Sequence, residues 1–244
     1  GYKGSKYAED DPCSENIRIN GGDVTAISLG DGTGNGGSGI GAGGDSSATD
    51  IYISGGNVLA IGGTFEDFGE PKSSAGIGGN FWWKYTGVGK RTSYPMNIVI
   101  SGGVVNAIGA VGIGSSVDWN AYWDGLDPTW EGKYSDTKVT ISGGTVTASS
   151  TLGSPGTAIG NVNDMGNCTT TITGGSVQAT VLANGSTSAG KVSGAVNKWG
   201  EAVSKTTVTI DGATNNTRIT DLDQMGTAHA DTPYGMKDVY TSGN

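Results

Sequence analysis

Aromatic side chains gather in two stretches of this chain. Five of the six tryptophans lie within residues 80–85 and 118–130, where the rings are interleaved with asparagine, aspartate and lysine. A pyranose ring has a face of C–H groups that packs on an indole plane, and its hydroxyl groups need hydrogen-bond donors and acceptors nearby. The pattern therefore favours a site that binds sugars.

The candidate ligand contacts come from these two segments. The rings that we expect to pack on a sugar are Trp82, Trp83, Tyr85, Trp119, Tyr122, Trp123 and Trp130. The side chains that we expect to bond its hydroxyl groups are Asn80, Asp118, Asn120 and Asp124. The alternative is that some rings fold down and hold the long loops, which is the favoured role for Phe81 because it lacks a polar group. Trp199 either extends the surface or packs its own loop.

The sequence contains few groups that could catalyse a reaction. A glycosidase needs two carboxylates about 5 to 10 Å apart, and the candidates are Glu66, Asp67, Glu70, Asp118, Asp124, Asp127 and Glu131. Loop carboxylates in an acidic protein are usually solvated, and hydrogen bonding to sugar hydroxyls explains them equally well. The single histidine, His229, lies in a polar tail, and no Ser-His-Asp set, Cys-His pair or metal-ligand spacing is visible. We therefore expect no catalysis and no cofactor, with a structural calcium ion at Asp31 or around Asp221 to Asp223 as an alternative.

A repeated phrase defines the elements that carry these segments. Short runs of alternating apolar and polar residues flank a Gly-Gly pair, and the phrase begins at Asn16, Asp50, Asn97, Lys138 and Thr169 before it decays near Thr207. Alternation at period two predicts strands, and the glycine pair predicts a turn between them. A glycine-rich run such as Ala75-Gly-Ile-Gly-Gly follows in most units. Each unit therefore contains three short strands.

The constant phrase with variable spacing predicts an all-β fold, a single-stranded, right-handed parallel β-helix (solenoid). It has about six coils, with loops of different lengths between its strands. Inward residues should form two ladders. One is Ile19, Ile53, Ile100, Ile141, Ile172 and Ile210, and the other is Val24, Val58, Val105, Val146 and Val177. A β-sandwich or jelly roll is the alternative, while the lack of any helical period excludes an α-solenoid.

The repeat covers most of the chain, so we predict one domain over residues 1–244. Residues 1–15 form an N-terminal cap, 16–220 the coils and 221–244 a C-terminal tail or cap, because open end coils invite aggregation. Both aromatic segments follow the glycine-rich strand of consecutive units. We therefore expect them to leave the coil at the same corner and to form a binding surface on one flank.

Charge and composition exclude several partners. The net charge of -9 argues against nucleic acid and anionic membrane surfaces, and no apolar run approaches the roughly 20 residues that span a bilayer. Nothing at Gly1 resembles a signal peptide, so we interpret the chain as a module of a larger protein.

The two cysteines, Cys13 and Cys168, fall at a similar phase of two repeats. They either form a disulfide or remain two unpaired thiols, and the sequence leaves both alternatives open.

The phrase Ile-Ser-Gly-Gly-x-Val-x-Ala, followed by Ala-Gly-Ile-Gly-Gly, resembles repeats in secreted and surface proteins of gut Firmicutes. Together with the tryptophan-rich insertions, the chain resembles the xylan-binding carbohydrate-binding modules of family 89, which are β-helical and attached to xylanases. The repeat covers residues 16–212 and identifies the fold more than the ligand, while the aromatic insertions carry the resemblance in ligand binding. It implies xylan as the ligand, no catalysis within the module, a catalytic domain in the same polypeptide, and secretion or cell-surface location. The alternatives are a β-helical glycoside hydrolase or polysaccharide lyase, and a surface adhesin that binds host glycans.

Overall fold

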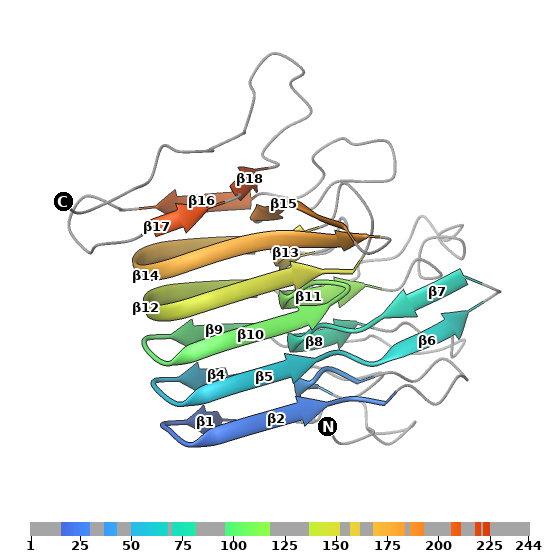
Figure 1. Ribbon diagram of the computed structural model, residues 1–244, viewed down its shortest axis with the longest axis horizontal. Coiled ribbons are helices and arrows are strands. Elements are labelled where there is room, and N and C mark those ends of the chain that lie inside the picture. Colours follow the sequence, from blue (N-terminus) through green and yellow to red (C-terminus); the bar gives the residue numbers. More distant parts are fainter. Residues whose placement is uncertain are drawn as a thin grey trace, which may run out of the picture.

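The computed structural model describes most of the repeated coils. The described residues are 16–29, 37–42, 50–67, 70–81, 96–117, 137–151, 157–161, 168–183, 186–192, 206–210, 218–220 and 222–224. Every regular element among them is a β-strand, and the strands stack in successive layers (Figure 1). The predicted N-terminal cap, 1–15, and most of the predicted tail, 221–244, lie outside these residues.

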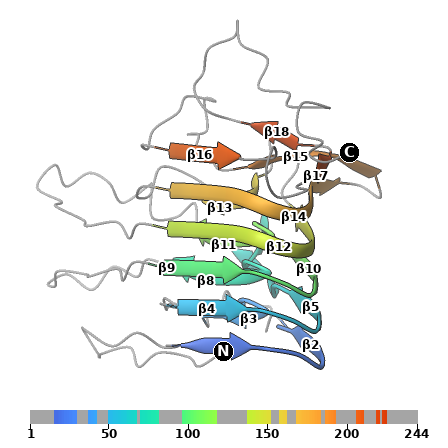
Figure 2. The ribbon, with the colours of Figure 1, turned by 90° about the vertical axis from the view of Figure 1, so that its left-hand side faces the viewer.

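The first strands of the coils form one parallel column. They are β1 (Ile17–Ile19), β4 (Asp50–Ile53), β9 (Met96–Ile100), the first part of β12 (Thr137–Ser150), the first part of β14 (Cys168–Ala183) and β16 (Thr206–Ile210). Each pairs in parallel with its equivalent in the next coil. Figure 2 shows this stack from the side.

The second and third strands form two further parallel columns. The second strands are β2 (Asp23–Ile27), β5 (Asn57–Ile61), β10 (Val104–Gly109), the later parts of β12 and β14, and β17 (Arg218–Thr220). The third strands are β3 (Ile40–Gly41), β8 (Ile77–Phe81), β11 (Ile113–Val117), β13 (Thr157–Asn161), the end of β15 (Ser186–Val192) and β18 (Leu222–Gln224). Six coils of three strands form a right-handed parallel β-helix, as predicted.

Two details differ from a regular set of three short strands. In the fourth and fifth coils the first two strands join into β12 and β14, which run through the glycine corner with a shifted register. Two antiparallel pairs are added. The hairpin of β6 (Thr64–Asp67) and β7 (Glu70–Ser73) lies between the second and third strands of coil two, and the end of β14 pairs with the start of β15.

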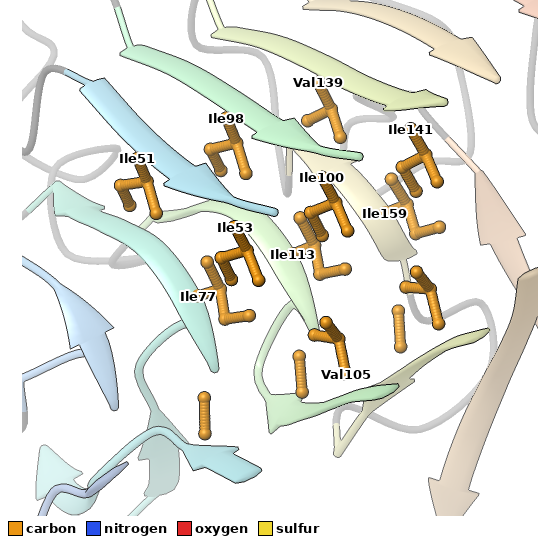
Figure 3. Packing of buried hydrophobic residues seen from close by; sticks show 14 of the residues in the cluster. Ile51, Ile53, Ile77, Ile98, Ile100, Val105, Ile113, Val139, Ile141 and Ile159 are labelled. Atoms are coloured by element: carbon orange, nitrogen blue, oxygen red, sulfur yellow. The ribbon is translucent and has the colours of Figure 1, made fainter. Parts of the chain in front are cut away.

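The core contains the two predicted inward ladders together with further rows of buried residues. Ile53, Ile100, Ile141 and Ile172 are buried in one, and the valines from Val58 to Val177 in the other. A third ladder comes from the glycine-rich strands and consists of Ile40, Ile77, Ile113 and Ile159. Figure 3 shows how the isoleucines of neighbouring coils point into the same interior. Ile19 and Val24 are only partly buried because they belong to the first coil, and the side chain of Ile210 lies outside the described part.

The glycine pair makes the corner between the first and second strands, as predicted. Gly56 has φ +92, and a Cβ on it would lie 2.6 Å from the carbonyl oxygen of Gly22 in the coil before. Glycine is required here because the backbones of successive coils approach so closely.

No membrane-spanning helix occurs within the described part of the chain.

Candidate functional site

The two aromatic segments start from neighbouring strand ends. Phe81 is the last residue of β8 and pairs in parallel with Val117, the last residue of β11. Asn80 and Ser116 form the preceding pair. Residues 82–95 follow Phe81 directly, and residues 118–136 follow Val117. Because paired strands lie about 4.8 Å apart, both segments depart from the same place in consecutive coils.

The two segments also end at neighbouring positions. Met96 begins β9 and Thr137 begins β12, and these two residues pair in parallel. We call this place, bounded by Phe81, Val117, Met96 and Thr137, the insertion corner. The expectation that both segments leave the coil at one corner is confirmed.

Most of the predicted ligand contacts lie outside the described residues. Asn80 is placed by its backbone in β8, directly before the insertion corner. The predicted contacts that lie outside the described residues are Trp82, Trp83, Tyr85, Asp118, Trp119, Asn120, Tyr122, Trp123, Asp124 and Trp130. Their roles stay predictions, and the structure gives the two ends of the segments that carry them.

Three of the candidate catalytic carboxylates occupy a different corner. Glu66, Asp67 and Glu70 belong to the β6–β7 hairpin, in which Asp67 pairs with Glu70. This hairpin lies between the second and third strands, whereas the insertion corner lies between the third strand and the first strand of the next coil. Asp118, Asp124, Asp127 and Glu131 lie outside the described residues.

The described residues bear on the metal alternative but not on the disulfide. None of them form a group of three or more His, Cys, Asp or Glu side chains that could hold a metal ion. Asp31, Asp221 and His229 lie outside the described part, and Asp223 is placed only by its backbone in β18. Cys168 pairs in register with Thr137. Since Cys13 is not among the described residues, the disulfide stays an open prediction.

A polar cluster beside the insertion corner was not predicted from the sequence. The side chains of Asp50, Tyr52 and Asn97 come together on the outer face of the first-strand column, and we call them the polar cluster. The Asn97 Nδ2 donates to Asp50 Oδ1 and to the Tyr52 hydroxyl, each at 3.4 Å. The guanidinium of Arg18 stands 4.3 Å from the centre of the Tyr52 ring. The cluster could have been predicted by aligning the repeats at the phrase Asx-Ile-x-Ile and comparing its outward positions from one repeat to the next.

Comparison with known families supports the coil architecture. The family model for the beta helix repeat matches residues 51–81, 98–117 and 139–161. These segments begin and end within the second, third and fourth coils. No curated protein and no solved structure gives a significant match to the chain. The match therefore supports the fold and names no ligand.

Proposed function

We propose that this chain is a non-catalytic carbohydrate-binding module that recognises xylan of plant cell walls through residues 82–95 and 118–136. The observation that carries this proposal is the pairing of Phe81 with Val117 and of Met96 with Thr137. It anchors both ends of two tryptophan-rich segments at one corner, in consecutive coils. The ligand then contacts rings from both segments at once.

A rigid frame suits this task. Loops that bind are usually held by a scaffold that does not move, and here each anchor strand is paired in parallel with the coils on both sides. Fixing the four loop ends in advance lowers the entropy lost when a polysaccharide binds. The net charge of -9 is compatible with a neutral polysaccharide and disfavours anionic partners.

The proposal assigns the chemistry to another domain. The module targets a glycoside hydrolase in the same polypeptide to its substrate, outside the cell or at its surface, and needs no cofactor. Glu66, Asp67 and Glu70 belong to the β6–β7 hairpin, which leaves the coil at a different corner from the aromatic segments. This separation supports giving these three residues no part in the sugar site.

Affinity electrophoresis in gels that contain soluble xylan tests the proposal. Wild-type protein should be retarded, and Trp82→Ala, Trp119→Ala and Trp123→Ala should each weaken binding by at least about tenfold if they are central contacts. Leu29→Ala is the matched control for a lost apolar surface, because Leu29 is 86% exposed and lies beyond the end of β2. A wild type that migrates freely, or three fully retarded tryptophan variants, contradicts the proposal.

An activity assay on the same preparation separates binding from catalysis. We expect no reducing sugars or unsaturated products from xylan, pectin or host glycans. Product release would identify a hydrolase or lyase instead. Binding to mucin-type glycans on an array, without binding to xylan, would identify an adhesin.

A further inference from the structure

The outer face of the first-strand column carries a patch of hydrogen-bonding side chains next to the insertion corner. Outward positions in this column alternate with the buried ladder residues, so they form rows along the stack. One row runs through Asp50, Asn97, Lys138 and Thr169. The next row runs through Arg18, Tyr52, Val99 and Thr140.

The polar cluster occupies the start of these rows and is internally connected. Asn97 bridges to the Asp50 carboxylate in its own row and to the Tyr52 hydroxyl in the next. Arg18 stacks on the Tyr52 ring from the first coil. Asp50, Tyr52 and Asn97 are each half-buried, so their positions are restrained while part of each side chain stays accessible to solvent.

The contacts of Asn97 are long enough to be exchanged for a ligand. The two side-chain hydrogen bonds that Asn97 donates to Asp50 and Tyr52 measure 3.4 Å each, beyond the usual N–H···O range of about 2.7 to 3.2 Å. A side-chain amide offers two donors and a carbonyl acceptor, a carboxylate offers only acceptors, and a phenol offers one of each. This combination matches the hydroxyl groups of a sugar, which both donate and accept.

The place of the cluster in the chain connects it with the aromatic segments. Asn97 comes one residue after Met96, where residues 82–95 end, and Lys138 comes one residue after Thr137, where residues 118–136 end. The first outward side chains after both segments therefore belong to the same row. A glycan held at the insertion corner lies within reach of this row, since Asn97 and Lys138 each come one residue, about 3.3 Å along the strand, after the residue that bounds the corner.

We propose that Asn97, together with Asp50 and Tyr52, binds hydroxyl groups of the polysaccharide and extends the binding site from the insertion corner onto the outer face of the first-strand column. This inference rests on the proposed function. The cluster supplies hydrogen bonds that select the arrangement of hydroxyls, while the rings of the aromatic segments supply apolar contact.

The competing explanation is that the cluster only joins neighbouring strands. Cross-strand polar pairs stabilise a sheet, and such a role would change the melting temperature without changing the affinity for a glycan. Affinity at unchanged melting temperature is therefore the measurement that separates the two.

Calorimetric titration of the full chain with soluble xylan tests the inference, using Asn97→Ala and Tyr52→Phe. The matched control is Asn106→Ala. Asn106 belongs to the same coil, is exposed, and lies on β10 in the second-strand column. Loss of one hydrogen bond of about 1 kcal/mol should weaken binding about fivefold in Asn97→Ala. Asn106→Ala should bind as the wild type does.

The outcomes separate this inference from the proposed function. If the wild type binds xylan and both Asn97→Ala and Tyr52→Phe bind with unchanged affinity, the polar cluster is structural and the inference is wrong. Tyr52→Phe keeps the ring under Arg18, so it reports on the hydroxyl even if Asn97→Ala melts early. A wild type that binds no polysaccharide overturns the proposed function, and this inference with it.

Discussion

Gly78 and Gly114 approach each other so closely across coils two and three that the carbonyl of Gly114 occupies the place where a Cβ on Gly78 would stand. The same relationship joins Gly41 to Gly78 and Gly114 to Gly160. Gly78 also has φ +140, a backbone conformation that side chains disfavour. The glycine-rich strand therefore needs glycine at these positions, because a side chain there would collide with the backbone of the next coil.

Gly78→Ala should destabilise the protein by at least about 2 kcal/mol, because backbone strain and overpacking each cost about 1 to 3 kcal/mol. Gly21→Ala is the matched control, since a Cβ there has nothing within 4 Å and needs no positive φ. Thermal unfolding followed by circular dichroism compares the two. Equal melting temperatures would contradict the close approach of Gly78 and Gly114.

Ile100→Asp should prevent folding or leave the protein insoluble. Ile100 is fully buried in the middle of its ladder, and an ionised carboxylate there has no partner to offset its loss of hydration. Val104→Asp serves as the control because Val104 is 52% exposed on the outer face. Soluble expression and melting temperature are the measurements. An Ile100→Asp protein that melts like the wild type would contradict the inward ladder.

Thr180→Val should lower the free energy of unfolding by about 1 to 3 kcal/mol. The Thr180 hydroxyl lies 2.8 Å from the Ser149 hydroxyl, and both residues are buried, so the substitution leaves Ser149 without this partner. A double-mutant cycle with Ser149→Ala measures the coupling of the two hydroxyls by denaturant unfolding. If the two substitutions change the free energy of unfolding additively, the hydrogen bond between the two hydroxyls makes no contribution to stability.

Thr137→Val should act in the opposite direction and raise stability by about 1 kcal/mol. Among the described residues, the Thr137 Oγ1 is buried without a hydrogen-bond partner, so its hydroxyl loses hydration and gains nothing in return. The change removes that cost and keeps the β-branched shape that strands favour. A shift in melting temperature of about 2 to 4 °C upward is expected for a domain of this size. A downward shift comparable to that of Thr180→Val would contradict the prediction.

The coils and their inward ladders could be predicted because their signal is local. Alternation at period two in phrases such as Ile98-Val-Ile100 assigns strands and faces, and Gly102-Gly103 assigns the corner. Since every coil repeats the phrase, one correct assignment places equivalent residues of all coils in register. The burial of Ile53, Ile100, Ile141 and Ile172 follows from that.

The β6–β7 hairpin was not predicted because its local signal points elsewhere. Pro71 lies within β7 and pairs with Glu66, although proline is unfavourable inside a central strand. A two-stranded sheet consists of edge strands only, so proline is tolerated there. Nothing in the repeat indicates that this spacer, and not another, folds back on itself.

The anchors of the aromatic segments were predictable as well, because a segment that follows the same strand in two consecutive coils must start at the same corner. The polar cluster was predictable only in part, because the phrase gives the row of its residues and not the hydrogen bonds among them. Asp50 and Asn97 are 47 positions apart and approach each other only once the coils are stacked. Strands, corners and the inward ladders follow from short-range alternation and glycine pairs, since these act within one repeat. The repeated phrase also places Asp50 beside Asn97. Which outward side chains then bond one another depends on how each side chain is oriented once the coils are stacked, and only the tertiary structure shows that Asn97 reaches the Tyr52 hydroxyl in the neighbouring row.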